Sequence, residues 1–231
     1  MQVNVKWGSK VSASFSELAI CIGLMNSVHV ERENERLCEL KRTVYAEVKA
    51  KHDVEALKEN PTVRAYRDFY WKLGIDPTKT RPSGEALLRR VLHGSELPCI
   101  STVVDAYNLA SMKTIIPISG FDGDCLYPPF QVRFARNDEA FLGIGMDKLL
   151  PLSDKMLVLA DEKQILCVYP YRDSDYTKIT EQTRNVIIVG YGAPAIAEKR
   201  LEEAVGTTLA YIKDVSEGEI AMVKVFSCKP K

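Results

Sequence analysis

The chain has 231 residues, of which 46% are hydrophobic and 27% are charged, a composition typical of a soluble globular protein with a full core. Lysine plus arginine and aspartate plus glutamate each number 31, so the formal net charge is zero. A protein that binds nucleic acid tightly on its own usually carries a basic excess. The balance therefore disfavours that class, although it is compatible with a local basic patch.

The first ten residues lack an apolar run behind a basic start, and the longest apolar stretch, 18–25, is far shorter than the ~20 residues that span a bilayer. We therefore expect a cytoplasmic protein with no membrane partner. The six cysteines form no C-x-x-C pair, which favours reduced, buried thiols. The three histidines have no metal-like spacing, so we expect no metal and no cofactor.

Hydrophobic periodicity predicts mainly helices in the first half of the chain. A three- and four-residue apolar spacing predicts helices at 31–51, 61–73, 82–93 and 100–112. Pro61 and Pro82 suit the first turns of two of them. Short apolar or alternating runs predict strands at 3–7 and 18–30.

The second half is predicted to hold most of the strands. Alternating or β-branched runs place them at 114–119, 131–136, 141–145, 156–160, 164–169, 186–189 and 218–226. A turn-rich connection is expected at 120–129 and one amphipathic helix at 194–215.

Strands and helices are mixed without a regular β-α-β rhythm, which predicts an α+β fold: a layered sandwich of mixed, mostly antiparallel strands with packed helices. We expect a single domain over 1–231. Within it, 31–94 is expected to be a helical N-terminal part and 95–231 the core.

Three segments carry candidate functional residues. On the helix at 100–112, Asp105 and Asn108 lie three residues apart and are predicted to point the same way, either into a pocket or toward water. A basic cluster, Arg81, Arg89 and Arg90, is either an RNA contact or an exposed helix face.

The third segment, 171–183, is densely polar and lies between two predicted strands, where a rigid scaffold can present a loop for binding. Arg172 suits a carboxylate or a phosphate through its planar fork. The alternative is that Arg172 pairs with Asp173 or Asp175 while the threonines cap a turn.

Several common catalytic motifs are absent from the sequence. It contains no G-x-x-x-x-G-K-[ST] phosphate loop, no G-x-G-x-x-G and no G-x-S-x-G. An enzyme of nucleotide chemistry is therefore a third, weaker hypothesis.

The order of several short motifs resembles the editing (B3/B4) domain of the phenylalanyl-tRNA synthetase beta subunit. V-V-D-A-Y-N at 103–108, followed by P-I-S-G-F-D at 117–122, is similar to its V-V-D-x-x-N and P-x-H-A-F-D segments. L-V-L-A-D at 157–161 is similar to its L-V-I-A-D strand, and Asp173, Ser174 and Thr183 fall on its G-G-E-D-S…T stretch. R-P-S-G-E-A-L-L-R-R at 81–90 resembles free-standing versions of the domain. The match covers roughly residues 76–192.

The resemblance implies the fold of that domain and its chemistry, which is hydrolysis of tyrosine wrongly esterified to phenylalanine tRNA without a metal or a covalent nucleophile. The chain is too short for a complete aminoacyl-tRNA ligase. Two positions depart from the bacterial pattern, because Ser119 replaces a histidine and Val189 replaces a glutamate, both of which recognise the tyrosyl group there. Archaeal members use other polar residues, which leaves room for Asp173, Ser174 and Thr177.

Two functions of different classes follow. The first is a deacylase with Asp173, Ser174 and Asn108 as catalytic residues. Its substrate-binding residues are Arg172, Ser119, Asp105, Thr177 and Thr183, and the acceptor end of a tRNA meets Arg81, Arg89 and Arg90. The second is a non-catalytic module that binds an amino acid or a small metabolite in the same pocket.

Overall fold

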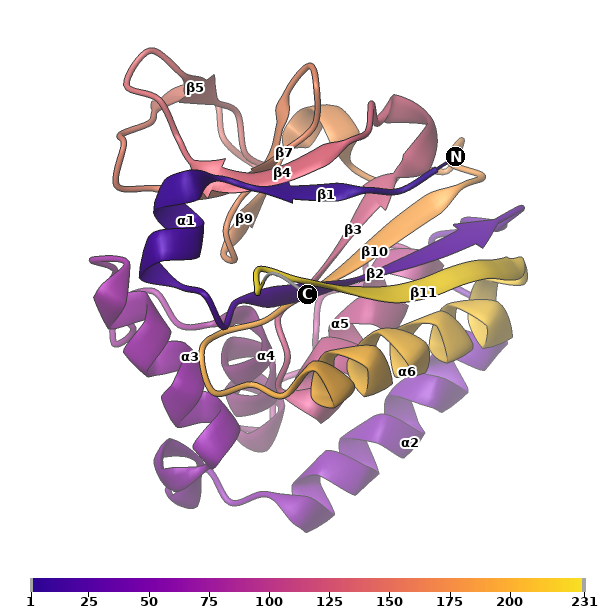
Figure 1. Cartoon of the computed structure of the whole chain (residues 1–231). Helices are drawn as coiled ribbons and strands as arrows, with labels where there is room; N and C mark the ends of the chain where they lie inside the picture. Colours follow the sequence, from indigo (N-terminus) through magenta and orange to yellow (C-terminus); the bar gives the residue numbers. More distant parts are fainter. Residues whose placement is uncertain (1, 230–231) are drawn as a thin grey trace.

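We analysed a computed structural model that describes residues 2–229. Two stacked sheets and a layer of helices make up the fold, with the five-stranded sheet above the four-stranded sheet and the helices α2, α5 and α6 below it (Figure 1). The α+β class and the mostly antiparallel pairing predicted from the sequence are confirmed. No helix within residues 2–229 is both long and apolar enough to cross a membrane.

The four-stranded sheet has the order β11-β2-β10-β3, and all its neighbours are antiparallel. Its strands are β2 (Ala19–Asn26), β3 (Ile118–Asp122), β10 (Val186–Tyr191) and β11 (Glu219–Ser227). The central strands β2 and β10 are buried on both faces, which explains why they are apolar runs rather than alternating ones.

The five-stranded sheet has the order β1-β4-β7-β8-β9, in which only the β1–β4 pair is parallel. Its strands are β1 (Val5–Trp7), β4 (Phe130–Phe134), β7 (Leu157–Ala160), β8 (Ile165–Val168) and β9 (Arg172–Asp173). A hairpin of β5 (Ala140–Phe141) and β6 (Leu150–Pro151) contributes Phe141 to a small second apolar cluster with Val158 and Ala160.

The helix layer packs on the four-stranded sheet through α5 (Thr102–Thr114) and α6 (Glu198–Ser216), with α2 (Glu35–Lys51) packed against both helices. Close approach of α6 depends on Gly23 of β2, where an added Cβ would lie 2.7 Å from a methyl of Val205. Figure 1 shows α3 (Pro61–Lys72) and α4 (Ser83–Leu92) at one end of this layer.

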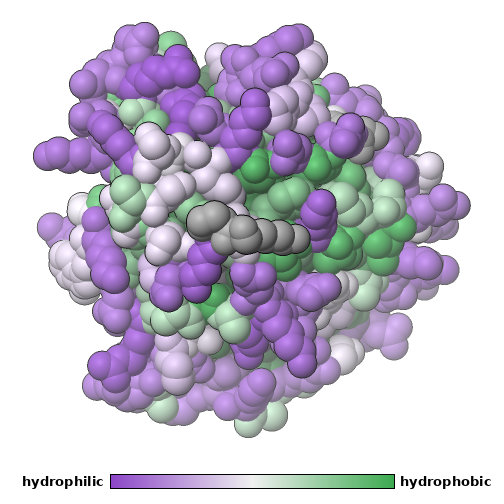
Figure 2. Space-filling view, viewed as in Figure 1, coloured by the Kyte–Doolittle hydropathy of each residue, from purple (hydrophilic) through white to green (hydrophobic). Residues whose placement is uncertain are grey.

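Aromatic rings from α3, from the residue after β8 and from β10 pack edge-to-face on one another. Phe69 of α3 meets Tyr169 edge-to-face at 6.2 Å, and Tyr169 meets Tyr191 of β10 at 4.7 Å. The Tyr66 hydroxyl of α3 donates to the carbonyl of Tyr191 at 2.6 Å. On the face shown in Figure 2, hydrophobic residues gather between the edge strands β1 and β11, and hydrophilic residues cover most of the rest.

Several predicted boundaries move, and side-chain caps at Asn34 and Ser101 account for two of the shifts. The helix expected from residue 31 begins at Glu35, where the Asn34 side chain accepts from the Leu37 amide. The helix expected from residue 100 begins at Thr102, where Ser101 is the cap, and the one expected from residue 194 begins at Glu198. The strand expected at 18–30 ends at Asn26.

The strand predicted at 114–119 is wrong. Helix α5 continues to Thr114 and is followed by Ile115 in a left-handed conformation with φ of 62°, so the strand starts only at Ile118 and runs to Asp122. Consecutive β-branched residues there suggested a strand, but packing of α5 against α6 and β3 overrides that local preference. The short helix α1 (Ser9–Ser14) was not predicted, because only Val11 in it is buried.

Candidate active site between the two sheets

The candidate site joins the edge strands of the two sheets. The Ser119 hydroxyl of β3 donates a 2.6 Å hydrogen bond to the Asp173 carboxylate of β9. Ser119 faces the five-stranded sheet because its neighbour Gly120 faces the opposite way, where an added Cβ would lie 2.8 Å from the Tyr107 ring of α5. The two residues are 54 positions apart in sequence, and only the stacking of the sheets brings them together.

Asp173 is the titratable group of this site. Burial raises the pKa of Asp173 to about 7, although the Ser119 hydrogen bond and the charge of Arg172 both act to lower it. At neutral pH the carboxyl group therefore exists in both protonation states. A group with such a pKa suits proton transfer in either direction.

Val189 and Tyr191 of β10 lie on the same face of the four-stranded sheet as Ser119. Val189 is the direct cross-strand partner of Ser119 and is buried, so it places an apolar side chain beside the serine that bonds to Asp173. The Tyr191 hydroxyl lies 3.0 Å from the Cys167 sulfur. Burial raises the pKa of both Tyr191 and Cys167, so both groups stay neutral and Cys167 is no thiolate nucleophile.

Arg172 holds its guanidinium at the surface beside Asp173. It is exposed, and its Nη1 donates to the Ile144 carbonyl at 3.3 Å. Within residues 2–229 it forms no ion pair, since Asp173 bonds to Ser119 and Asp175 pairs with Lys178 at 2.9 Å. The ion pair of Arg172 with Asp173 or Asp175 that the alternative predicted is therefore absent from the described residues, although the Arg172 charge acts to lower the pKa of Asp173.

Ser174 and Thr177 shape the loop that follows β9. The Ser174 hydroxyl accepts from the Tyr176 amide at 3.2 Å and caps a short 3-10 helix, η3 (Asp175–Thr177). Thr177 is fully buried, and its hydroxyl has no hydrogen-bond partner in the described part of the chain. Ser174 thus has a structural role, whereas Thr177 retains an unused polar group.

Thr183 caps a turn, as one of the two sequence interpretations proposed. Its hydroxyl donates to the Asp122 carboxylate at 2.6 Å and accepts from the Thr180 amide at 3.0 Å. These bonds fix the loop before β10 to the end of β3. They leave the Thr183 hydroxyl occupied by protein partners.

Asp105 and Asn108 lie on α5, and neither forms a hydrogen bond or an ion pair with Asp173 within residues 2–229. Asp105 is buried, pairs with Lys41 of α2 at 2.7 Å and accepts from the Ile100 amide at 3.0 Å, so it ties two helices together. Asn108 is partly buried, and no hydrogen bond within residues 2–229 links it to Ser119 or Asp173.

The basic cluster on α4 is partly neutralised. Glu85 is buried and forms ion pairs with both Arg89, at 2.6 Å, and Arg67 of α3. Arg90 is exposed and donates to the Glu96 carbonyl at 2.6 Å, and Arg81 is exposed. Helix α4 packs on α5 and α2 in the helix layer rather than on the two strands that carry Ser119 and Asp173.

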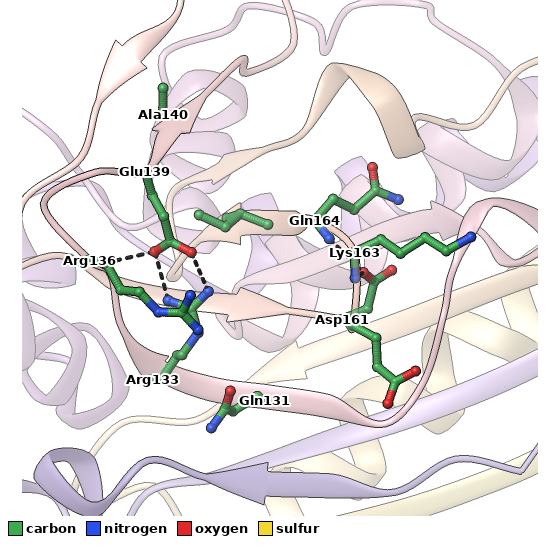
Figure 3. A pocket seen from close by; sticks show the side chains of 10 residues that line it. Gln131, Arg133, Arg136, Glu139, Ala140, Asp161, Lys163 and Gln164 are labelled. Atoms are coloured by element: carbon green, nitrogen blue, oxygen red, sulfur yellow. Dashed lines mark hydrogen bonds and ion pairs between the residues drawn. The ribbon is translucent and has the colours of Figure 1, made fainter.

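A separate polar groove of about 400 Å³ lies on the five-stranded sheet and contains none of the predicted site residues (Figure 3). Its Arg133 is held by Glu139 through two hydrogen bonds of 2.6 and 2.8 Å. Its Asp161 accepts from backbone amides, including that of Lys163 at 2.7 Å. Because its partly buried Arg133, Glu139 and Asp161 are already partnered within the protein, we favour the Asp173 site.

Tyr191 and Cys167 were missed by the sequence analysis. The alternation of β10 gives a signal for Tyr191, because residues 189 and 191 must face the same side of the sheet. No sequence signal pairs Cys167 with Tyr191, because they come from different sheets.

Comparisons of this chain with a family model and with individual relatives agree with each other. The B3/4 domain family matches residues 65–211. Phenylalanine–tRNA ligase beta subunits of Haemophilus ducreyi and of Xylella fastidiosa (strain Temecula1) are 26% and 31% identical over 147 and 123 residues. These matches cover 54% and 53% of this chain but only 18% and 15% of those proteins.

A solved N-terminal fragment of the phenylalanyl-tRNA synthetase beta subunit from Pyrococcus horikoshii shares the fold. It aligns over 95% of this chain and 50% of that fragment, with a TM-score of 0.51 and 14% sequence identity. The family match extends over more than half of the sequence, from α3 into α6. This chain therefore belongs to the B3/4 domain family.

Proposed function

We propose that this protein hydrolyses an aminoacyl ester on the 3′ end of a tRNA at the Asp173 site. The observation that carries the proposal is a single carboxyl group with a pKa of about 7, hydrogen-bonded to Ser119 and next in sequence to Arg172, which forms no ion pair within residues 2–229. Membership of the B3/4 family supports the proposal, since the relatives are synthetase subunits that act with tRNA.

In the proposed reaction, the Asp173 carboxylate removes a proton from a water molecule as its oxygen attacks the ester carbonyl carbon. The ester C–O bond then breaks, and the protonated Asp173 returns the proton to the leaving ribose oxygen. The products are a free amino acid and the tRNA. No covalent enzyme intermediate is needed, in keeping with neutral Cys167 and Tyr191.

Ser119 and Val189 set the surroundings of the reacting groups. Ser119 holds the carboxylate in one orientation, and the apolar Val189 keeps the site dry enough for Asp173 to retain its raised pKa. Arg172 binds an anionic group of the substrate, for which a phosphate is the simplest candidate.

A non-catalytic module for an amino acid or a small metabolite is the second candidate. The Glu85–Arg89 ion pair favours it, because that pair removes a cation from the face predicted to meet RNA. The zero net charge points the same way.

The test is a deacylation panel. Purified protein is incubated with tyrosyl-tRNA(Phe) and with other mischarged tRNAs, alongside Asp173→Asn and the control Asp175→Asn. We expect hydrolysis of at least one species, lost in Asp173→Asn and retained in the control, because Asp175 is already paired with Lys178. Absence of hydrolysis by wild type across the panel, together with calorimetric binding of an amino acid, would favour the second candidate.

A further inference from the structure

A short segment of the chain extends the Asp173 site into a surface strip. Residues 142–146 run along β9 and η3, with the Ile144 amide donating to the Asp173 carbonyl and the Asp175 amide donating to the Leu142 carbonyl, both at 2.9 Å. Gly143 and Ser174 form an antiparallel bridge between these bonds. The backbone on both sides of Asp173 is therefore fixed before any ligand arrives.

Arg172 lies directly across Gly143. A Cβ at position 143 would lie 2.4 Å from the Arg172 Cδ, so only glycine allows the side chain to take this path. Its Nη1 reaches the Ile144 carbonyl at 3.3 Å. Because Gly143 has no side chain, the Arg172 side chain can lie over it. The charged guanidinium remains exposed to solvent.

Tyr176 presents its ring to solvent on η3, with 63% of the residue exposed. Its backbone is anchored by the Ser174 cap, and the next residue, Thr177, is fully buried. Ile144 on the neighbouring segment is also 43% exposed. Tyr176 and Ile144 thus each expose a side chain from two backbone segments that are hydrogen-bonded to each other, and an exposed aromatic ring is a surface on which a base can stack.

The local charges favour an anion at this strip. Arg172 forms no ion pair within residues 2–229, whereas the neighbouring acid Asp175 is neutralised by Lys178 at 2.9 Å. Single-stranded nucleic acid is bound by this combination of an exposed aromatic ring and an arginine. In contrast, Arg89 of α4 is occupied by the buried Glu85.

We propose that Arg172, Ile144 and Tyr176 form a docking strip for the single-stranded 3′ end of an RNA. Tyr176 stacks on a base and Arg172 binds a phosphate, which directs the terminal ribose toward Asp173. This inference rests on the proposed function for the reaction that follows docking. It also replaces α4 as the RNA contact, since the strip adjoins the reacting carboxyl group.

The direct test is fluorescence anisotropy with a short labelled single-stranded RNA that ends in CCA. We expect Tyr176→Ala to bind about tenfold more weakly, because stacking on one base contributes that order of affinity, and Tyr176→Phe to bind like wild type. Tyr127→Ala is the matched control, because Tyr127 is another tyrosine on the surface, with 41% of the residue exposed. Its ring is in contact with the Lys163 ammonium group. Its affinity is expected to be unchanged.

Two further variants separate the position of Arg172 from its charge. Arg172→Ala is expected to weaken binding and reduce the slope of log affinity against log salt by about one. Gly143→Ala keeps the charge but displaces the side chain, and is expected to weaken binding while leaving the salt slope nearer to wild type. The proposed docking strip would be contradicted if the wild-type protein bound no RNA. It would also be contradicted if RNA binding depended on Arg81 and Arg90 and not on the strip residues.

A small substrate separates this inference from the proposed function. Hydrolysis of an amino-acid ethyl ester needs Asp173 but no RNA, so Tyr176→Ala is expected to leave it unchanged while raising the KM for aminoacyl-RNA about tenfold. If no ester is hydrolysed but RNA binding still depends on Tyr176, the strip stands and the reaction falls. If esters are hydrolysed and Tyr176→Ala binds RNA like wild type, the reaction stands and the strip falls.

Discussion

Asp173 combines two opposing influences on one carboxyl group. Burial between the sheets disfavours its charged form, while the Ser119 hydroxyl and the Arg172 charge favour it, and the net result is a pKa of about 7. An ordinary aspartate, with a pKa of about 3.9, would be ionised at neutral pH and a poor proton donor. The surroundings therefore make this residue fit for both halves of an ester hydrolysis.

The raised pKa has a consequence for stability. Between about pH 4 and pH 7 the folded protein keeps a proton on Asp173 that the unfolded chain has released, so this residue's contribution to the free energy of unfolding falls as the pH rises. We expect Asp173→Asn to remove this decrease in the free energy of unfolding with rising pH. Urea unfolding at pH 4.5 and pH 8 measures it, and the variant should lose less stability between the two than wild type.

The control for this experiment is Asp175→Asn, which changes a partly exposed aspartate on the same loop. It is expected to follow the wild-type dependence on pH. An equal change in wild type and Asp173→Asn would show that Asp173 titrates at its ordinary value.

At the scale of elements, the helices are joined by buried charges rather than by apolar contacts alone. Glu85 of α4 binds Arg67 of α3 and Arg89 of its own helix, and Asp105 of α5 binds Lys41 of α2. Each of these carboxylates has only 1% of its side chain exposed. Such groups orient helices because an unpaired buried charge is costly.

We expect Glu85→Gln to lower the free energy of unfolding by roughly 3 kcal/mol, because it leaves two partly buried arginines without their carboxylate. The matched control is Glu59→Gln, which removes an ion pair with Arg64 whose partners are 67% and 64% exposed. That change should cost less than about 1 kcal/mol. Chemical denaturation measures both, and equal losses would contradict a structural role for Glu85.

At the scale of the whole molecule, the site depends on how closely three layers stack. Helix α6 reaches the four-stranded sheet over Gly23, and the sheet in turn presents Ser119 to the five-stranded sheet. A change in the spacing of one layer is therefore transmitted to the strand that carries Ser119, since packed interiors are dense and barely compressible.

Gly23→Ala tests this stacking. The new methyl group would lie 2.7 Å from Val205 and 2.9 Å from Leu209, so we expect a loss of about 1–3 kcal/mol of stability from overpacking. Gly206→Ala in α6 is the control, because its added Cβ meets nothing within 4 Å and should stabilise the helix by about 0.5–1 kcal/mol. A thermal melt distinguishes the two, and a neutral Gly23→Ala would mean that α6 is free to move outward.

The sequence predicts the layers better than the site. Apolar runs such as those of β2 and β10, and the stripes of α3 and α6, are local patterns that determine an element type without reference to the rest of the chain. The order of motifs also pointed to Ser119 and Asp173. Their 2.6 Å contact, however, depends on two edge strands from different sheets, which no local pattern encodes.

The absence of such contacts from local sequence patterns also explains why several residues have roles other than those predicted. Ser174 was predicted to be catalytic and Thr183 to bind substrate, yet the Ser174 hydroxyl bonds within its own loop and the Thr183 hydroxyl bonds to Asp122 at the end of β3. Arg172 was predicted to bind substrate and Arg89 to bind RNA. Only the fold shows that Arg89 is paired with a buried Glu85 while Arg172 lies over a glycine without an ion pair in the described chain.

The most direct test of the account is the rate of aminoacyl ester hydrolysis between pH 5 and pH 9 for wild type, Ser119→Ala and Asp173→Asn. We predict that the wild-type rate rises with an inflection near pH 7 as Asp173 ionises. Ser119→Ala should move the inflection to higher pH, since it removes a hydrogen bond that lowers the pKa of Asp173, and Asp173→Asn should abolish it. A wild-type profile without this inflection, or one that Asp173→Asn leaves unchanged, would contradict the assignment of Asp173 as the acid–base group.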